Sequence, residues 1–230
     1  MRDWLSFWNE KGKSKTDFQA TGRGLMRVSG YLFTVAEIAR LLDLETQDRL
    51  VDVGCGAGLI PLSLSPWVES IKAFDISPTL LDRARKNLLG VGNVTCDFGE
   101  LCSIPIPDSS ADKLLAYSVL QYLDSEQSIV AAMREVYRVL KPGGCALFGA
   151  NPDPTKRKIY EQVIIRNNQE LEAAKLELAL MNDVLWVAGE RLISLAERQG
   201  FEARVIPINK RIWQHFYMFD LVVKKVSEGS

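Results

Sequence analysis

The chain has 230 residues, of which 47% are hydrophobic and 25% are charged, a composition that predicts one domain with a substantial core and excludes disorder. The formal net charge of -1 disfavours a general nucleic-acid surface. No apolar stretch is long enough for a signal peptide or a membrane span, so we expect a cytoplasmic protein. The four cysteines form no CxxC pair and there is one histidine, which indicates neither a metal site nor a disulfide framework.

Residues 1–47 predict a helical N-terminal cap. Trp4 and Trp8 lie among polar side chains in residues 2–12, the pattern of a short amphipathic helix that needs an apolar surface beneath it. A second helix is expected from about Ser29, where apolar residues recur at three- and four-residue spacing. The aromatic side of the first helix could pack on its own domain or on a neighbouring subunit, so a homodimer stays open.

Residues 48–150 predict the core of an α/β fold. The apolar run at 50–53 stops at a glycine-rich turn and is followed by apolar residues at helical spacing, which indicates a strand, a tight loop and a helix. Four more strands are expected at 70–75, 93–98, 113–118 and 145–150, with helices after Ser77 and over about 125–140. Such alternation predicts a parallel sheet covered on both faces, with ligands beyond the carboxyl ends of its strands.

Residues 151–187 interrupt the alternation and predict a helical lid. A Pro-Asp-Pro turn precedes what the pattern indicates to be one long charged helix with an apolar side made by Leu171, Ala174, Leu178 and Met181. Because this insertion leaves the carboxyl end of the fifth strand, we expect it to cover the ligand site. Residues 188–225 then predict a helix and two strands, whose connection is too short for a parallel crossover, so the last strand is expected to be antiparallel.

The glycine-rich turn, residues 54–58, is the candidate ligand loop. Glycines let the backbone turn sharply and approach a ligand, and the N–H groups at the following helix start favour polar ligand groups. Asp75 lies 21 residues beyond Gly54, the separation at which a carboxylate can bind both ribose hydroxyls. A phosphate-binding P-loop would need Gly-Lys-Ser/Thr and a nicotinamide dehydrogenase would need GxGxxG, so both classes are disfavoured.

Taken in motif order, residues 48–225 resemble a class I S-adenosylmethionine-dependent methyltransferase. The resemblance rests on the glycine loop, acids after the second and third strands, the segment 116–120 that closes the fourth strand, and the Lys-Pro-Gly-Gly at 141–144. It implies a Rossmann-like, doubly wound sheet of seven mostly parallel strands with an antiparallel last strand. It also implies S-adenosylmethionine as cofactor and S-adenosylhomocysteine as product.

The resemblance assigns cofactor contacts residue by residue. It implies that Asp75 binds the ribose, that Asp97 binds the adenine amino group, and that Phe98 or Ile76 lines the adenine ring. It further implies that Gly54 and Gly56 approach the methionine part of the cofactor, that Asp52 lies near its ammonium group and that Arg23 binds its carboxylate. Ser118, at the end of the fourth strand, is also implied to contact the cofactor.

The acceptor side is less determined by sequence. A hydroxyl or ammonium acceptor needs a base, for which His215 and Tyr117 are candidates, although a packed or solvent-facing role is the alternative for the histidine. Asn151 and Tyr160 are candidate substrate contacts from the lid. The leading hypothesis is methyl transfer to an O or N atom of a small molecule, because the cap and lid favour an enclosed pocket. A protein or tRNA methyltransferase and a non-catalytic cofactor-binding partner subunit are the alternatives.

Overall fold

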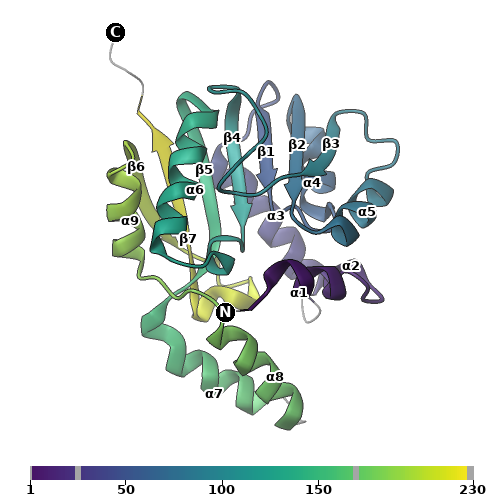
Figure 1. Cartoon of the computed structure of the whole chain (residues 1–230), viewed down its shortest axis with the longest axis vertical. Coiled ribbons are helices and arrows are strands. Elements are labelled where there is room, and N and C mark those ends of the chain that lie inside the picture. Colours follow the sequence, from purple (N-terminus) through teal and green to yellow (C-terminus); the bar gives the residue numbers. More distant parts are fainter. Residues whose placement is uncertain (1, 24–26, 168–170, 227–230) are drawn as a thin grey trace.

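The computed structural model describes residues 2–23, 27–167 and 171–226, with the side chains of 171–173 left aside. Within this part of the chain a seven-stranded sheet has the order β3-β2-β1-β4-β5-β7-β6 (Figure 1). Its strands are β1 (Arg49–Val53), β2 (Ser70–Asp75), β3 (Val94–Phe98), β4 (Ala111–Tyr117), β5 (Leu140–Pro152), β6 (Phe201–Pro207) and β7 (Met218–Lys225).

The strand pairing confirms the predicted fold class. β1 runs parallel to β2 on one side and to β4 on the other, whereas β7 is antiparallel to both β5 and β6. The strand order therefore reverses between β1 and β4. In an open α/β sheet, the crevice at the carboxyl ends of two such strands is the place where ligands bind.

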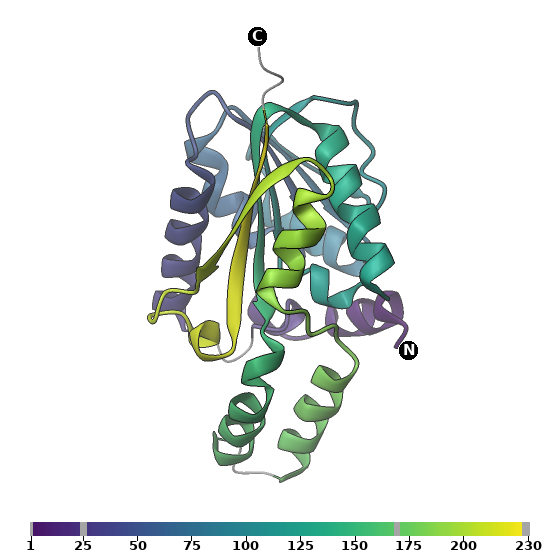
Figure 2. The ribbon, with the colours of Figure 1, turned by 90° about the vertical axis from the view of Figure 1, so that its left-hand side faces the viewer.

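Helices cover both faces of the sheet (Figure 2). Side chains alternate between the two faces along each strand. On one face, Leu50 and Leu115 belong to a core with α3 (Val28–Leu42) and α4 (Leu59–Leu64). On the other face, Val51 and Leu114 belong to a core with α6 (Glu126–Val139) and α9 (Gly189–Glu197). α5 (Pro78–Asn87) packs on β2 and β3, and the Leu80 N–H donates to the N-cap Ser77 hydroxyl at 3.2 Å.

The cap lies across the carboxyl ends of the parallel strands, where α1 (Trp4–Lys11) and α2 (Asp17–Ala20) are seen below the arrowheads in Figure 1. Arg83 of α5 ties it down, donating to the Gly12 carbonyl at 2.5 Å and to Asp17 at 2.8 Å. The Trp4 ring packs edge-on against Tyr122, with 4.7 Å between centroids. The aromatic side of α1 thus packs on its own domain.

The insertion after β5 corrects one prediction. Instead of one long helix, α7 (Arg157–Asn167) and α8 (Leu171–Asn182) form a hairpin that projects beyond the cap (Figures 1 and 2). Folding back buries Tyr160, Ile164 and Ala174, which a single projecting helix would leave in water. Residues 168–170 between the helices lie outside the described residues, as does the side chain of the predicted stripe residue Leu171.

Shorter elements complete the described chain: η1 (Ser65–Trp67), η2 (Leu120–Tyr122), η3 (Pro154–Lys156) and η4 (Trp213–Phe216). None of the helices in the described ranges combines the length and the apolar character that crossing a membrane requires.

Candidate functional site

The loop between β1 and α4 has a backbone that glycine alone adopts without strain. Gly54, Gly56 and Gly58 have φ values of 82°, 58° and 76°. A Cβ on Gly54 would lie 2.4 Å from Val119 Cγ2, and one on Gly56 would lie 2.8 Å from Thr21 Cγ2. The glycines therefore allow both the left-handed turn and the close approach of β4 and the cap to the loop.

Asp75, at the end of β2, is held in place by this loop. Its Oδ2 accepts the N–H of Gly56 at 2.8 Å and its Oδ1 accepts the N–H of Ser77 at 2.9 Å. Burial raises the pKa of Asp75, although these N–H donors act in the opposite direction. Since each carboxylate oxygen has two lone pairs, both oxygens can accept a further hydrogen bond from a ligand.

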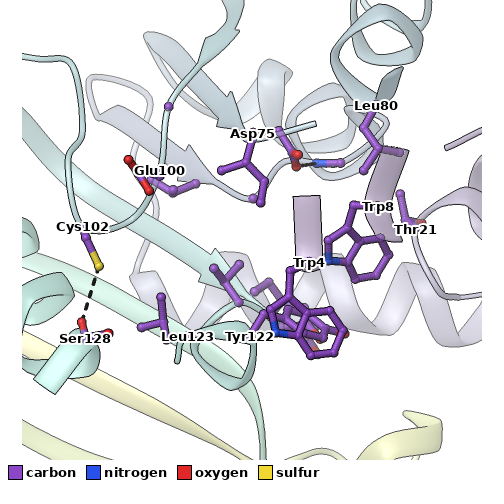
Figure 3. Close-up of a pocket in the computed structure, with 18 of the residues that line it drawn as sticks. Trp4, Trp8, Thr21, Asp75, Leu80, Glu100, Cys102, Tyr122, Leu123 and Ser128 are labelled. Atoms are coloured by element: carbon purple, nitrogen blue, oxygen red, sulfur yellow. Dashed lines mark hydrogen bonds between the residues drawn. The ribbon is translucent and has the colours of Figure 1, made fainter. Parts of the chain in front are cut away.

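A cavity of about 560 Å³, called the first cavity below, lies beyond the ends of β1, β2 and β4. Asp75 and Glu100 lie on one side of it, with Trp4, Trp8 and Tyr122 across from them (Figure 3). Besides Asp75, five predicted cofactor residues line this cavity: Gly54, Gly56, Ile76, Ser118 and Arg23.

Two predicted adenine contacts lie elsewhere. Asp97 and Phe98 are exposed, with 60% of Phe98 accessible, and neither lines the first cavity. Gly99 and Glu100, which follow the edge strand β3 and precede the turn at 101–102, line the cavity instead. The available signal was an acid directly after the glycine that follows the strand, which sequence reasoning passed over in favour of the acid within the strand.

Asp52 is a buried carboxylate on the opposite face of β1 from the core residue Val53. It is 2% exposed, and its Oδ2 has no hydrogen-bond partner among the described residues. Burial raises the pKa of Asp52 to about 7, with the charge of Arg23 lowering it and that of Asp75 adding to the rise. Asp52 does not line the first cavity, although the next residue, Val53, does, and a buried oxygen without a partner is a candidate for a ligand donor.

The two predicted bases fare differently. Tyr117 ends β4 and lines the first cavity, with 5.9 Å between its ring centroid and the Arg23 guanidinium carbon. Burial raises the pKa of its hydroxyl, so the phenol stays protonated near neutral pH and cannot accept the acceptor's proton. His215 is exposed in η4, where its Nδ1 donates to the Ile212 carbonyl at 2.9 Å, and it lines neither cavity of the site. The structure therefore places His215 outside the lining of both cavities, and its catalytic role stays a prediction.

A second cavity, of about 540 Å³, lies between the cap and the α7–α8 hairpin. Tyr160 lines it and donates its hydroxyl to Glu177 at 3.2 Å. Asn151 does not, because its amide donates to the Phe148 carbonyl at 2.7 Å within the irregular end of β5. Of the two predicted substrate contacts, Tyr160 thus lines the second cavity and Asn151 does not, and both roles stay predictions.

The described residues contain no group of three or more His, Cys, Asp or Glu side chains that could hold a metal ion.

Comparisons with known proteins agree with this geometry. Residues 51–148 match a family model described as a methyltransferase domain. The chain is 31% identical over 101 residues to a malonyl-[acyl-carrier protein] O-methyltransferase of Serratia marcescens, covering 44% of this chain and 37% of the relative. It is 35% identical over 112 residues to a trans-aconitate 2-methyltransferase of Methylobacterium nodulans, covering 48% and 41%. The matches thus span well under half the length of these curated relatives.

Solved structures extend the likeness over the whole fold. The N-methyltransferase NodS from Bradyrhizobium japonicum, in complex with S-adenosylhomocysteine, superposes with a TM-score of 0.70 at 14% identity over 97% of this chain and 99% of that one. Together with the sheet order and the glycine loop, these findings define a Rossmann-like methyltransferase fold. Residues 51–148 are thus similar to methyltransferase domains, and they form the cofactor-binding part of a sheet with the class I methyltransferase fold.

Proposed function

We propose that the protein transfers a methyl group from S-adenosylmethionine to an O or N atom of a small molecule and releases S-adenosylhomocysteine. The observation that carries this proposal is the pair of adjoining cavities at the point where the strand order reverses. One is built around the glycine loop and Asp75, and the other is a cleft between the cap and the α7–α8 hairpin. An acceptor much larger than the second cavity would not use these walls, which favours a small molecule over a macromolecule.

The residues of the first cavity suit the cofactor. Asp75 keeps lone pairs for the ribose hydroxyls. Asp52 is not itself a lining residue but precedes the lining residue Val53, and its unpaired oxygen is suited to an ammonium group. Arg23 can form a bidentate pair with a carboxylate, and Glu100 takes the adenine-binding role expected of Asp97. When bound, S-adenosylmethionine supplies a methyl group already activated on a sulfonium. The protein's own task is then alignment and the exclusion of water.

Calorimetry with S-adenosylhomocysteine tests this proposal, with NAD as the control ligand. Asp75→Asn should weaken binding by about 2 kcal/mol, or thirtyfold, because a charge-assisted contact to the ribose is lost. Circular dichroism establishes that the variant is folded, since Asp75 also accepts two backbone N–H groups. Preference for NAD, or no binding by the wild-type protein, would refute the proposed cofactor.

A further inference from the structure

The two cavities meet at a junction through which an acceptor must reach the methyl group. The glycine loop lines the first cavity, and the cap, the α7–α8 hairpin and η4 line the second cavity. The junction is defined by the described residues that line both cavities: Arg2, Trp8, Thr21, Arg23, Tyr117, Ser118 and Tyr122.

Among its described residues, the junction has no side chain suited to remove a proton. A guanidinium has no acceptor atom, which rules out its two arginines, and burial raises the pKa of Tyr117 and of Tyr122. His215 lies outside both cavities. An acceptor must therefore arrive with a free lone pair and no proton to lose. At neutral pH a carboxylate meets this condition, whereas an ammonium or an alcohol does not.

The charges around the second cavity also favour an anion. Its described lining includes three cations, Arg2, Lys11 and Arg23, and one carboxylate, Glu177, which accepts the Tyr160 hydroxyl. The ammonium of Lys11 has no hydrogen bond or ion pair with any described residue, while Arg2 is paired with Asp183 of the lid at 2.7 Å. These cations compensate the desolvation of a bound carboxylate and repel an ammonium.

The opposite wall is apolar. α8 contributes Leu176, Leu180 and Met181, and Trp213 and Tyr217 lie on the same cavity. Apolar and aromatic walls with a few charged groups are typical of pockets that orient an amphipathic ligand by its polar end. The ligand's body is therefore hydrocarbon, aliphatic or aromatic.

We propose that the second cavity binds a carboxylic acid with an apolar or aromatic body and that its carboxylate is the methyl acceptor, an inference that rests on the methyl transfer proposed above. A carboxylate oxygen forms a bond to the methyl carbon as the carbon–sulfur bond breaks, and that bond's electron pair stays on sulfur. The products are a neutral methyl ester and a neutral thioether, with no proton to remove. Because opposite charges are neutralised, a water-poor junction favours the step.

The chemistry of the product tests the acceptor class. The protein receives S-adenosylmethionine tritiated in the methyl group and matched probes that differ only in their polar end: phenylbutyrate, phenylbutylamine and phenylbutanol, then decanoate, decylamine and decanol. Mild alkali releases an ester methyl as volatile methanol and leaves amine and ether methyls in place. We expect label in the acids alone, volatile after alkali.

The other outcomes separate the two proposals. Alkali-stable label on an amine or alcohol overturns the carboxylate acceptor and leaves methyl transfer standing. Binding of S-adenosylhomocysteine without label in any acid also overturns the carboxylate acceptor. Failure to bind S-adenosylhomocysteine overturns the proposed function itself.

A binding measurement that needs no turnover uses two neighbouring lysines. Phenylbutyrate is titrated by tryptophan fluorescence with S-adenosylhomocysteine present. Lys11→Met should weaken binding about tenfold, since a charge-assisted contact is lost. Lys13→Met is the matched control, because this side chain is 62% exposed, is paired with Glu10 and lies outside the cavity. Unchanged phenylbutyrate affinity in Lys11→Met, or an equal loss for phenylbutylamine, contradicts the proposal.

Discussion

Replacing Asp52 with asparagine should stabilise the ligand-free protein near neutral pH while weakening its binding of S-adenosylhomocysteine. The carboxyl group is 2% exposed, and its Oδ2 has no hydrogen-bond partner among the described residues. Burial raises its pKa from 3.8 to about 7. This rise in the pKa lowers the free energy of unfolding of the wild-type protein by about 4 kcal/mol at pH 7.

The gain should depend on pH in a defined direction. The folded-state pKa of Asp52 lies above the unfolded one, so its contribution to wild-type stability is complete below about pH 4 and is lost as the pH rises towards 7. The asparagine variant lacks this loss. The two proteins should therefore unfold alike near pH 4, and at pH 7 the variant should have a Tm higher by roughly 10 °C.

Thermal unfolding followed by circular dichroism at several pH values measures this difference. Asp220, whose pKa burial raises to about 6, adds a loss of the same sign, but it is present in both proteins and cancels in the comparison. Asp97→Asn is the control, because that carboxylate is exposed and should change stability by under about 0.5 kcal/mol. A Tm difference that is constant with pH, or a variant less stable at pH 8, would refute the reasoning.

Three further substitutions test the site. Gly54→Ala should lower the free energy of unfolding by about 1–3 kcal/mol in urea titrations, because φ at this position is 82° and the new Cβ would clash with Val119. An unchanged free energy of unfolding would contradict the inferred backbone strain. Glu100→Gln should weaken S-adenosylhomocysteine binding about tenfold by calorimetry, while Asp97→Asn should not; the reverse would restore the adenine role to Asp97. His215→Ala should keep kcat/KM within about twofold of wild type, and a tenfold drop would show that the exposed imidazole acts in the reaction.

The predicted cofactor residues that line the first cavity are those whose position neighbouring residues alone decide. A strand that ends in glycines must turn there, and an acid that ends the next parallel strand must lie at the same edge of the sheet. Gly54, Gly56 and Asp75 follow from these two statements. Asp97 does not line the cavity, because it lies exposed in the edge strand β3 and the chain reaches the cavity at Gly99 and Glu100.

Acceptor-side predictions needed the orientation of side chains, which sequence does not contain. His215 stands next to a cavity residue, Gln214, yet η4 leaves its imidazole exposed and bonded to a backbone carbonyl. Asn151 is at the predicted strand end, but the irregular pairing of β5 with β7 directs its amide to the Phe148 carbonyl. Both candidates were chosen for position along the chain, and local hydrogen bonds direct both side chains away from the two cavities.

The sequence by itself determined the Rossmann-like sheet, its antiparallel last strand and the glycine loop, because hydrophobic period, loop length and glycine spacing are local properties of the chain. Only the tertiary structure decided that the insertion folds into a hairpin and that the cap closes over the strand ends. The junction joins the cap, the end of β4 and η2, and the second cavity adds the hairpin and η4. Contacts among segments so far apart depend on packing, which no single stretch of sequence specifies.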